Sequence, residues 1–100
     1  MKKELWEILV PTTLHGTSIL EAHHHKWDEY VRSVAGGLTL LHTVKGQWIS
    51  PKQVAVAEPV IPVRVICTKA EIRRILRFTK RHYKQEVVLA YRLSDEVLFL

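Results

Sequence analysis

The spacing of apolar residues along this chain changes in the order strand, helix, strand, strand, helix, strand. Four stretches rich in Val, Ile, Leu and Trp have the composition of strands, and two other segments repeat apolar residues at the spacing of one helix face. The chain has 100 residues, which is close to the size of one ordinary domain. This order therefore predicts one α+β domain over residues 1–100, of the split βαβ type.

The four main strands are predicted at residues 5–10, 38–44, 60–67 and 87–93. The second strand is expected to continue to Ile49 across a bulge at Gly46. Residues 50–53 have the composition of a turn, so residues 54–57 are expected to return as the other arm of a hairpin, which Pro59 would end.

The first helix is predicted to begin between Glu21 and His23 and to end at Gly36-Gly37, because glycine takes the left-handed conformation of a helix end without strain. Its apolar face consists of Trp27, Tyr30, Val31, Val34 and Ala35.

Thr68 and Glu71 have the spacing of a capping box, which predicts that the second helix begins after Thr68. Its apolar stripe consists of Ile72, Ile75, Leu76, Thr79 and Tyr83.

In ferredoxin-like βαββαβ order, these elements form a four-stranded antiparallel sheet with both helices on one face. The first and third strands then lie side by side at the centre, with the fourth beside the first. The other face is left uncovered, and a small domain usually covers such a face with another subunit. We therefore expect a homo-oligomer, with a dimer favoured. A short C-terminal strand at residues 97–100 and the hairpin with Trp48 are further expected subunit contacts.

Several short sequence features also resemble a known family. They are Trp27, Gly37-Leu38-Thr39, Gly46-Gln47-Trp48, Glu58 and Tyr83. With these residues the chain resembles, over roughly residues 5–93, a family of small bacterial domains of unknown function with a ferredoxin-like core. The resemblance implies the same fold, and it transfers no functional residues because the family has no established activity. The layout is also similar to the dimeric α+β barrel proteins, in which two open sheet faces meet around a ligand cavity.

Composition and charge narrow the class of protein only slightly. The chain is 47% apolar, has a formal net charge of +5 and has a pI near 9.6, which admits nucleic acid, an acidic ligand or an acidic partner. Its one cysteine, Cys67, cannot form an internal disulfide. Because no leader and no membrane-spanning segment is recognisable, we expect a cytoplasmic protein without a membrane partner.

Three consecutive histidines, His23 to His25, stand at the start of the predicted first helix. Successive side chains on a helix point about 100° apart, so the three cannot easily share one metal ion. Zinc sites on helices use His at positions i and i+4, and Trp27 occupies the position that His23 would need. We therefore predict no metal site and no cofactor.

The second helix has six cations opposite its apolar stripe, with no acidic residue between Glu71 and Glu86. They are Arg73, Arg74, Arg77, Lys80, Arg81 and Lys84. Such a face could hold a phosphate backbone, but the solvent side of an amphipathic helix is also the ordinary place for charge. Stacking of bases as in RNA-recognition domains is excluded, because residues 60–67 contain no aromatic side chain.

A second charged group is predicted on the uncovered sheet face. Alternation places Arg64 outward, and Glu7, Arg92 and His42 are expected to share its face. Arginine suits carboxylate and phosphate groups, so Glu7, His42, Arg64 and Arg92 are a candidate site for an anionic small molecule. The alternative is that Glu7 and Arg64 form a cross-strand ion pair inside a subunit interface.

Three functional hypotheses remain, since the sequence has no nucleophile motif and no phosphate-binding glycine loop. The leading one is a small binding or interaction protein that associates with itself through its open sheet face, with a small-molecule cavity there. The second is a nucleic-acid-associated protein that uses the basic helix. The third is a cofactor-free enzyme of the dimeric α+β barrel type, with unknown catalytic residues and His42 as the one general base on the sheet.

Overall fold

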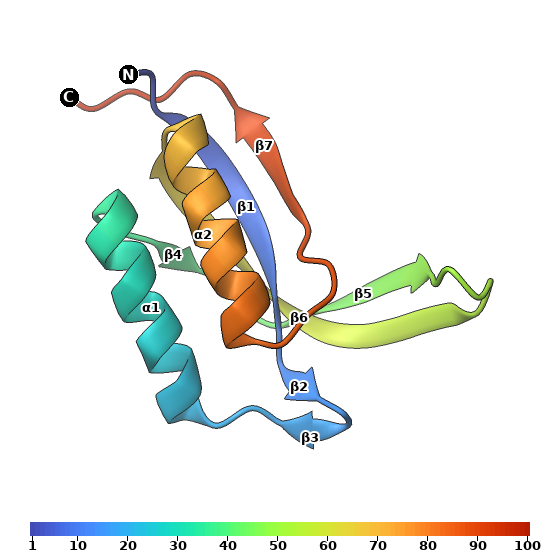
Figure 1. Ribbon diagram of the computed structural model, residues 1–100. Helices are drawn as coiled ribbons and strands as arrows, with labels where there is room; N and C mark the ends of the chain where they lie inside the picture. Colours follow the sequence, from blue (N-terminus) through green and yellow to red (C-terminus); the bar gives the residue numbers. More distant parts are fainter.

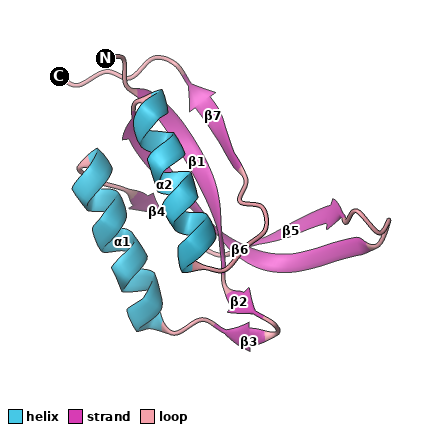
Figure 2. Ribbon diagram, viewed as in Figure 1, coloured by secondary structure: helices cyan, strands magenta, loops and turns pink.

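The computed structural model describes residues 1–100 and has two helices packed on one face of an antiparallel sheet (Figures 1 and 2). In chain order the elements are β1 (Glu4–Pro11), β2 (Thr13–Leu14), β3 (Thr17–Ser18), α1 (Glu21–Ala35), β4 (Thr39–Leu40), β5 (Val44–Ile49), β6 (Ala55–Cys67), α2 (Lys69–His82) and β7 (Ala90–Ser94). The main sheet has the order β4-β6-β1-β7, and β5 pairs with the first half of β6. The predicted α+β ferredoxin-like fold is confirmed, including the two central strands.

The core lies between the helices and the inner face of the sheet. Trp27 and Val31 from α1 and Ile75 from α2 belong to one cluster with Ile8 and Val63 from the central strands, and none of the five is more than 1% exposed. Neither helix has the length and apolarity that a crossing of the bilayer requires.

Both helices begin where the sequence predicts and α1 also ends there, whereas α2 ends at His82, so Tyr83 of the predicted stripe follows the helix. Gly36 follows α1 with a φ of 88°, which is the left-handed conformation that favours glycine. At the start of α2, the Glu71 amide donates to the Thr68 hydroxyl at 3.2 Å, and the Thr68 amide donates to the Glu71 carboxylate at 2.9 Å. The capping box is therefore complete.

The prediction that Pro59 ends a strand is wrong, because β6 runs unbroken through Pro59 and Pro62. The Thr12 hydroxyl donates to the Pro59 carbonyl at 2.8 Å, and the Leu41 amide donates to the Pro62 carbonyl at 3.0 Å. The nitrogen and the carbonyl of one strand residue face the same edge. The nitrogen of Pro59 thus faces away from β5, and the nitrogen of Pro62 faces away from β1. Neither β5 nor β1 therefore loses a hydrogen bond to β6.

The predicted second strand is divided into β4 and β5, which are separated at residues 41–43. Pro62 faces this segment but has no amide hydrogen to donate to it, so the ladder of backbone hydrogen bonds is interrupted there. Gly46 lies in regular register opposite Glu58, so the predicted bulge is wrong. A Cβ atom at Gly46 would come within 2.9 Å of the Trp48 ring, so the glycine makes room for that indole. The β5–β6 hairpin extends away from the helices (Figure 1).

The remaining differences lie toward the chain ends, and one is that β7 begins at Ala90, three residues later than predicted. β7 ends at Ser94, and residues 97–100 form no strand. Ser94 already pairs with Leu5 and β1 begins at Glu4, so no further strand is present for the C-terminal residues to join. The connection before α1 contains the small β2–β3 hairpin, which turns through the positive φ values of His15 and Gly16.

Candidate functional site

The sheet face opposite the helices is apolar around a charged centre. Leu89 just before β7 is 54% exposed, Tyr91 of β7 is 38% exposed, and Trp48 on the β5–β6 hairpin is 43% exposed. Leu9 lies beside Leu89, since its amide donates to the Leu89 carbonyl at 3.1 Å. No helix covers this face of the sheet (Figure 2).

The charged centre consists of Glu7, Arg64 and Tyr91, which we call the sheet-face cluster. Glu7 lies directly opposite Arg64 on one side and Tyr91 on the other. The Arg64 Nε donates to Glu7 Oε1 at 3.1 Å, and the Tyr91 hydroxyl donates to Glu7 Oε2. The hydrogen bond to Glu7 is the main cause that raises the pKa of Tyr91, with burial second.

These contacts leave one group of the cluster available to a ligand. Glu7 is 8% exposed and both of its carboxylate oxygens are engaged, whereas the Arg64 side chain is 46% exposed. Only the Nε of Arg64 is bonded to the protein. The outer guanidinium nitrogens are therefore free to donate to an acceptor that lies on the open face.

Two of the four predicted residues lie elsewhere. Arg92 sits opposite Trp6, on the helix side of the sheet, and its guanidinium donates to Glu4 Oε2 at 2.8 Å. The prediction that Arg92 joins Glu7 is thus wrong, because neighbouring residues of a strand point to opposite faces. By the same alternation Tyr91, the neighbour of Arg92, points to the open face, and it is the third member of the cluster.

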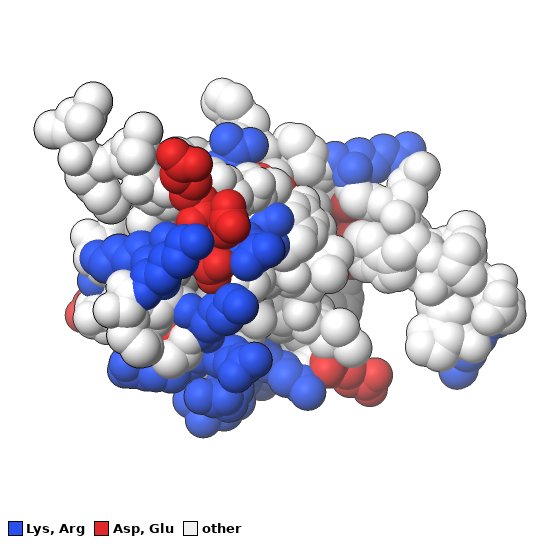
Figure 3. Space-filling model, turned by 90° about the horizontal axis from the view of Figure 1, so that it is seen from above, with Lys and Arg blue, Asp and Glu red and all other residues white.

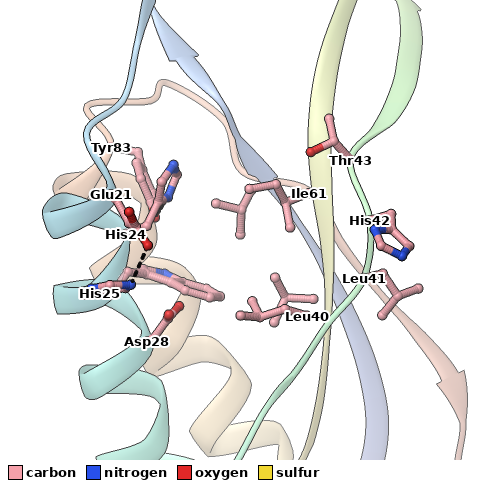
Figure 4. A pocket seen from close by; sticks show the side chains of 13 residues that line it. Glu21, His24, His25, Asp28, Leu40, Leu41, His42, Thr43, Ile61 and Tyr83 are labelled. Atoms are coloured by element: carbon pink, nitrogen blue, oxygen red, sulfur yellow. Dashed lines mark hydrogen bonds and ion pairs between the residues drawn. The ribbon is translucent and has the colours of Figure 1, made fainter.

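His42 also lies outside the cluster, in the segment between β4 and β5. It is one of the residues that line a cavity of about 320 Å³ between α1 and the sheet (Figure 4). His24 lines the same cavity, and its Nδ1 is 2.7 Å from the Tyr83 hydroxyl. Burial is the main cause that lowers the pKa of His24 and that raises the pKa of Tyr83.

The other histidines of the run point in different directions. His23 stacks on His82 of α2 with ring centroids 3.7 Å apart, and each Nε2 lies 2.7 Å from the carbonyl oxygen of the other residue. The Nε2 atom of His25 lies 3.4 Å from the Oε1 atom of Glu21. No group of three His, Cys, Asp or Glu residues is placed to hold a metal ion. Cys67 is fully buried, and burial raises the pKa of its thiol to about 12.

Five of the six predicted cations lie on α2, and Lys84 lies beyond the end of the helix with a positive φ. The six are Arg73, Arg74, Arg77, Lys80, Arg81 and Lys84. All six are exposed, and none of them forms an ion pair. Figure 3 shows a group of Lys and Arg side chains at the lower left of the molecule, with further Lys and Arg side chains elsewhere on the surface.

Fold and site together define a small ferredoxin-like protein with an uncovered sheet face. No family model and no curated protein sequence matches the chain. Among solved structures, the chain is similar to the divalent cation tolerance protein CutA1 from Thermus thermophilus, with a TM-score of 0.69 and 13% identity over 91% of this chain and 82% of that chain. CutA1 from Oryza sativa gives a TM-score of 0.70 at 7% identity, over 94% of this chain and 80% of that chain.

A structure of a different kind is equally similar. A phage SAM lyase, solved in complex with S-methyl-5′-thioadenosine, has a TM-score of 0.71 and 13% identity over 94% of this chain and 82% of that chain. Identities this low establish the shared fold only. The predicted likeness to small ferredoxin-like proteins is supported at that level.

Proposed function

We propose that this protein is a small binding protein that associates with itself through the open sheet face, with the sheet-face cluster inside the contact. The observation that supports this most directly is the combination of exposed Leu89 and Tyr91 beside the nearly buried carboxylate of Glu7, with exposed Trp48 farther along the sheet on the β5–β6 hairpin. An apolar face of this kind is stabilised when a second copy removes it from water.

The cluster suits such a contact because its charges are already balanced. Glu7 is paired with Arg64 and accepts a hydrogen bond from Tyr91, so its burial leaves no unpaired carboxylate. The free guanidinium nitrogens of Arg64 add a binding function, because they can donate to a carboxylate or phosphate enclosed between two copies. We propose a small anion as the ligand at that position.

The fold neighbours are compatible with this proposal without selecting a ligand. Proteins named for divalent cation tolerance and a lyase with a bound nucleoside share this backbone arrangement. One fold often serves several functions, so the site decides the function. In this chain, the sheet-face cluster and its apolar surroundings are the features that favour self-association.

Light scattering coupled to size-exclusion chromatography tests the assembly. The wild-type protein is expected to have at least twice the mass of the 11.6 kDa chain. Leu89→Glu should shift the population to the monomer, because a carboxylate is placed in the apolar contact. Leu20→Glu is the matched control, since Leu20 is 77% exposed and precedes α1, away from the sheet. A monomeric wild type, or equal dissociation by both variants, contradicts the proposal.

Thermal unfolding with added malonate or phosphate tests the ligand. Each anion is expected to raise the melting temperature of the wild type, because a ligand that binds only the folded state stabilises it. Arg64→Met should abolish the shift, whereas Arg74→Met on the solvent side of α2 should keep it. If Arg64→Met retains the full shift, the anion binds elsewhere.

A second candidate function is nucleic-acid binding by α2 and Lys84 just after it, because these six cations are exposed and without ion pairs. Binding of this type weakens steeply as salt rises. A triple change of Arg77, Lys80 and Arg81 to Glu should abolish binding of nonspecific DNA at low salt in a gel-shift assay. The absence of binding by the wild type at low salt would rule this function out.

A further inference from the structure

The cavity of about 320 Å³ between α1 and the sheet is distinct from the sheet-face cluster. Its walls are apolar and aromatic. Val10, Ile61 and Val63 line it from the sheet, and the aromatic residues Trp27 and Tyr83 line it from the helical layer. A volume of this size is at the lower end of the range for small-molecule sites, which are typically apolar with a few polar groups at defined positions.

The charge around this cavity is opposite to that of the whole chain. The protein has 15 Lys and Arg residues, yet none of them lines the cavity. The charged residues that do line it are the carboxylates Glu21 and Asp28, both on α1. Figure 4 shows Asp28 extending from α1 toward Leu40 on the opposite wall. A ligand in the cavity would therefore meet negative charge.

Asp28 has no partner within the protein. It is half-buried, and it takes part in no hydrogen bond and no ion pair. By contrast, Glu21 lies 3.4 Å from His25. The His24 Nδ1 is engaged with the Tyr83 hydroxyl at 2.7 Å, and burial lowers the pKa of His24 while the charge of Asp28 opposes that shift. The Asp28 carboxylate thus lies at the cavity without a hydrogen bond or an ion pair, and His24 is a neighbouring side chain that feels its charge.

We propose that this cavity binds a small organic cation with an apolar body, such as a substituted ammonium compound. Asp28 would be the counter-ion, and the apolar and aromatic walls would take the body of the ligand. A cation near aromatic rings gains further attraction from their electron-rich faces. This inference is independent of self-association, because no residue of the sheet-face cluster lines the cavity.

Isothermal titration calorimetry with benzyltrimethylammonium tests the inference. The cation is expected to bind saturably, while benzyl alcohol, which has the same ring without the charge, should bind more weakly and benzoate should not bind. Asp28→Asn keeps the shape of the side chain and should weaken binding of the cation roughly tenfold, by loss of one charge pair. Glu29→Gln is the matched control, because Glu29 is the next residue on α1, is exposed and does not line the cavity.

A second variant keeps the inference testable if Asp28→Asn fails to fold. Leu40 is 55% exposed at the edge of the cavity, so Leu40→Lys is expected to fold and to place a positive charge beside the ligand. It should abolish binding of the cation. The inference is overturned if the wild type does not bind benzyltrimethylammonium, if benzoate binds as well as the cation, or if Leu40→Lys binds with unchanged affinity.

Discussion

The indole nitrogen of Trp27 in α1 donates a 2.8 Å hydrogen bond to the hydroxyl of Thr79 in α2. That hydroxyl in turn donates to the Ile75 carbonyl at 2.6 Å. Both side chains are buried, with exposed fractions of 1% for Trp27 and 0% for Thr79. The pair therefore fixes the relative position of the two helices while it satisfies a polar group in the core.

Replacement of Thr79 by Val should lower the free energy of unfolding by about 1–3 kcal/mol, because the indole N–H would stay buried without an acceptor. Urea unfolding followed by tryptophan fluorescence measures the change. Thr39→Val on the exposed strand β4 is the control and should have little effect. Equal stability of the two variants would mean that the hydrogen bond contributes nothing.

The free energy of unfolding should fall as the pH is lowered from about 7.5 to about 5.5. Burial is the main cause that lowers the pKa of both His24 and His82 in the folded protein. The unfolded chain then binds more protons below a pH of about 6.5, so acid favours unfolding until the lowered pKa values are passed. Urea unfolding at several pH values measures the slope.

A variant separates this effect from other titrating groups. His82→Gln removes the ring that stacks on His23 and should flatten the dependence on pH in this range. A wild-type protein that is equally stable or more stable at the lower pH would contradict the assignment.

Glu7 and Arg64 should show a measurable coupling. The pair is partly screened by water because the Arg64 side chain is 46% exposed, so the coupling energy in the isolated chain should be on the order of 1 kcal/mol or less. A double-mutant cycle with Glu7→Gln, Arg64→Met and the combined variant measures it by urea unfolding. Strictly additive effects would mean that the pair contributes no net attraction.

Thr68→Ala should lower the free energy of unfolding by about 1 kcal/mol, because the first turn of α2 loses the acceptor for the Glu71 amide. Thr68→Ser keeps the hydroxyl and should retain most of the stability. Thermal unfolding of the two variants side by side measures the difference. If Ser and Ala destabilise the protein equally, the lost methyl group rather than the cap is responsible.

The helices were predictable from sequence because local chemistry determines them, and the strand order followed from the βαββαβ order of the elements. The Thr68–Glu71 box and the left-handed Gly36 act within one or two turns of chain, and the apolar periodicity identifies the buried faces. Strand ends were less predictable, because they depend on which edge of a strand meets a partner. Pro59 reads as a strand breaker in sequence, yet its nitrogen faces an edge where no strand needs it.

Part of the candidate site was predictable, because the register of the sheet brings its residues together. Glu7 and Arg64 face each other because the register of two central strands follows from the fold. Arg92 and Tyr91 are neighbours on β7 and point to opposite faces of the sheet, so the prediction depends on the exact register of β7 on β1, in which Tyr91 lies opposite Glu7. The cavity beside Asp28 could not be predicted, because it depends on the packing of α1 against a segment that is neither helix nor strand.

The two prolines of β6 also affect how the long strand behaves toward other molecules. β6 extends past the end of β1 on one edge and borders the gap between β4 and β5 on the other. Pro59 and Pro62 each lie at one of these open stretches with the ring nitrogen outward. An edge that lacks amide hydrogens is a poor template for an incoming strand. The unpaired stretch of β6 beyond the end of β1 thus offers one amide fewer to an incoming strand, which disfavours edge-to-edge pairing there.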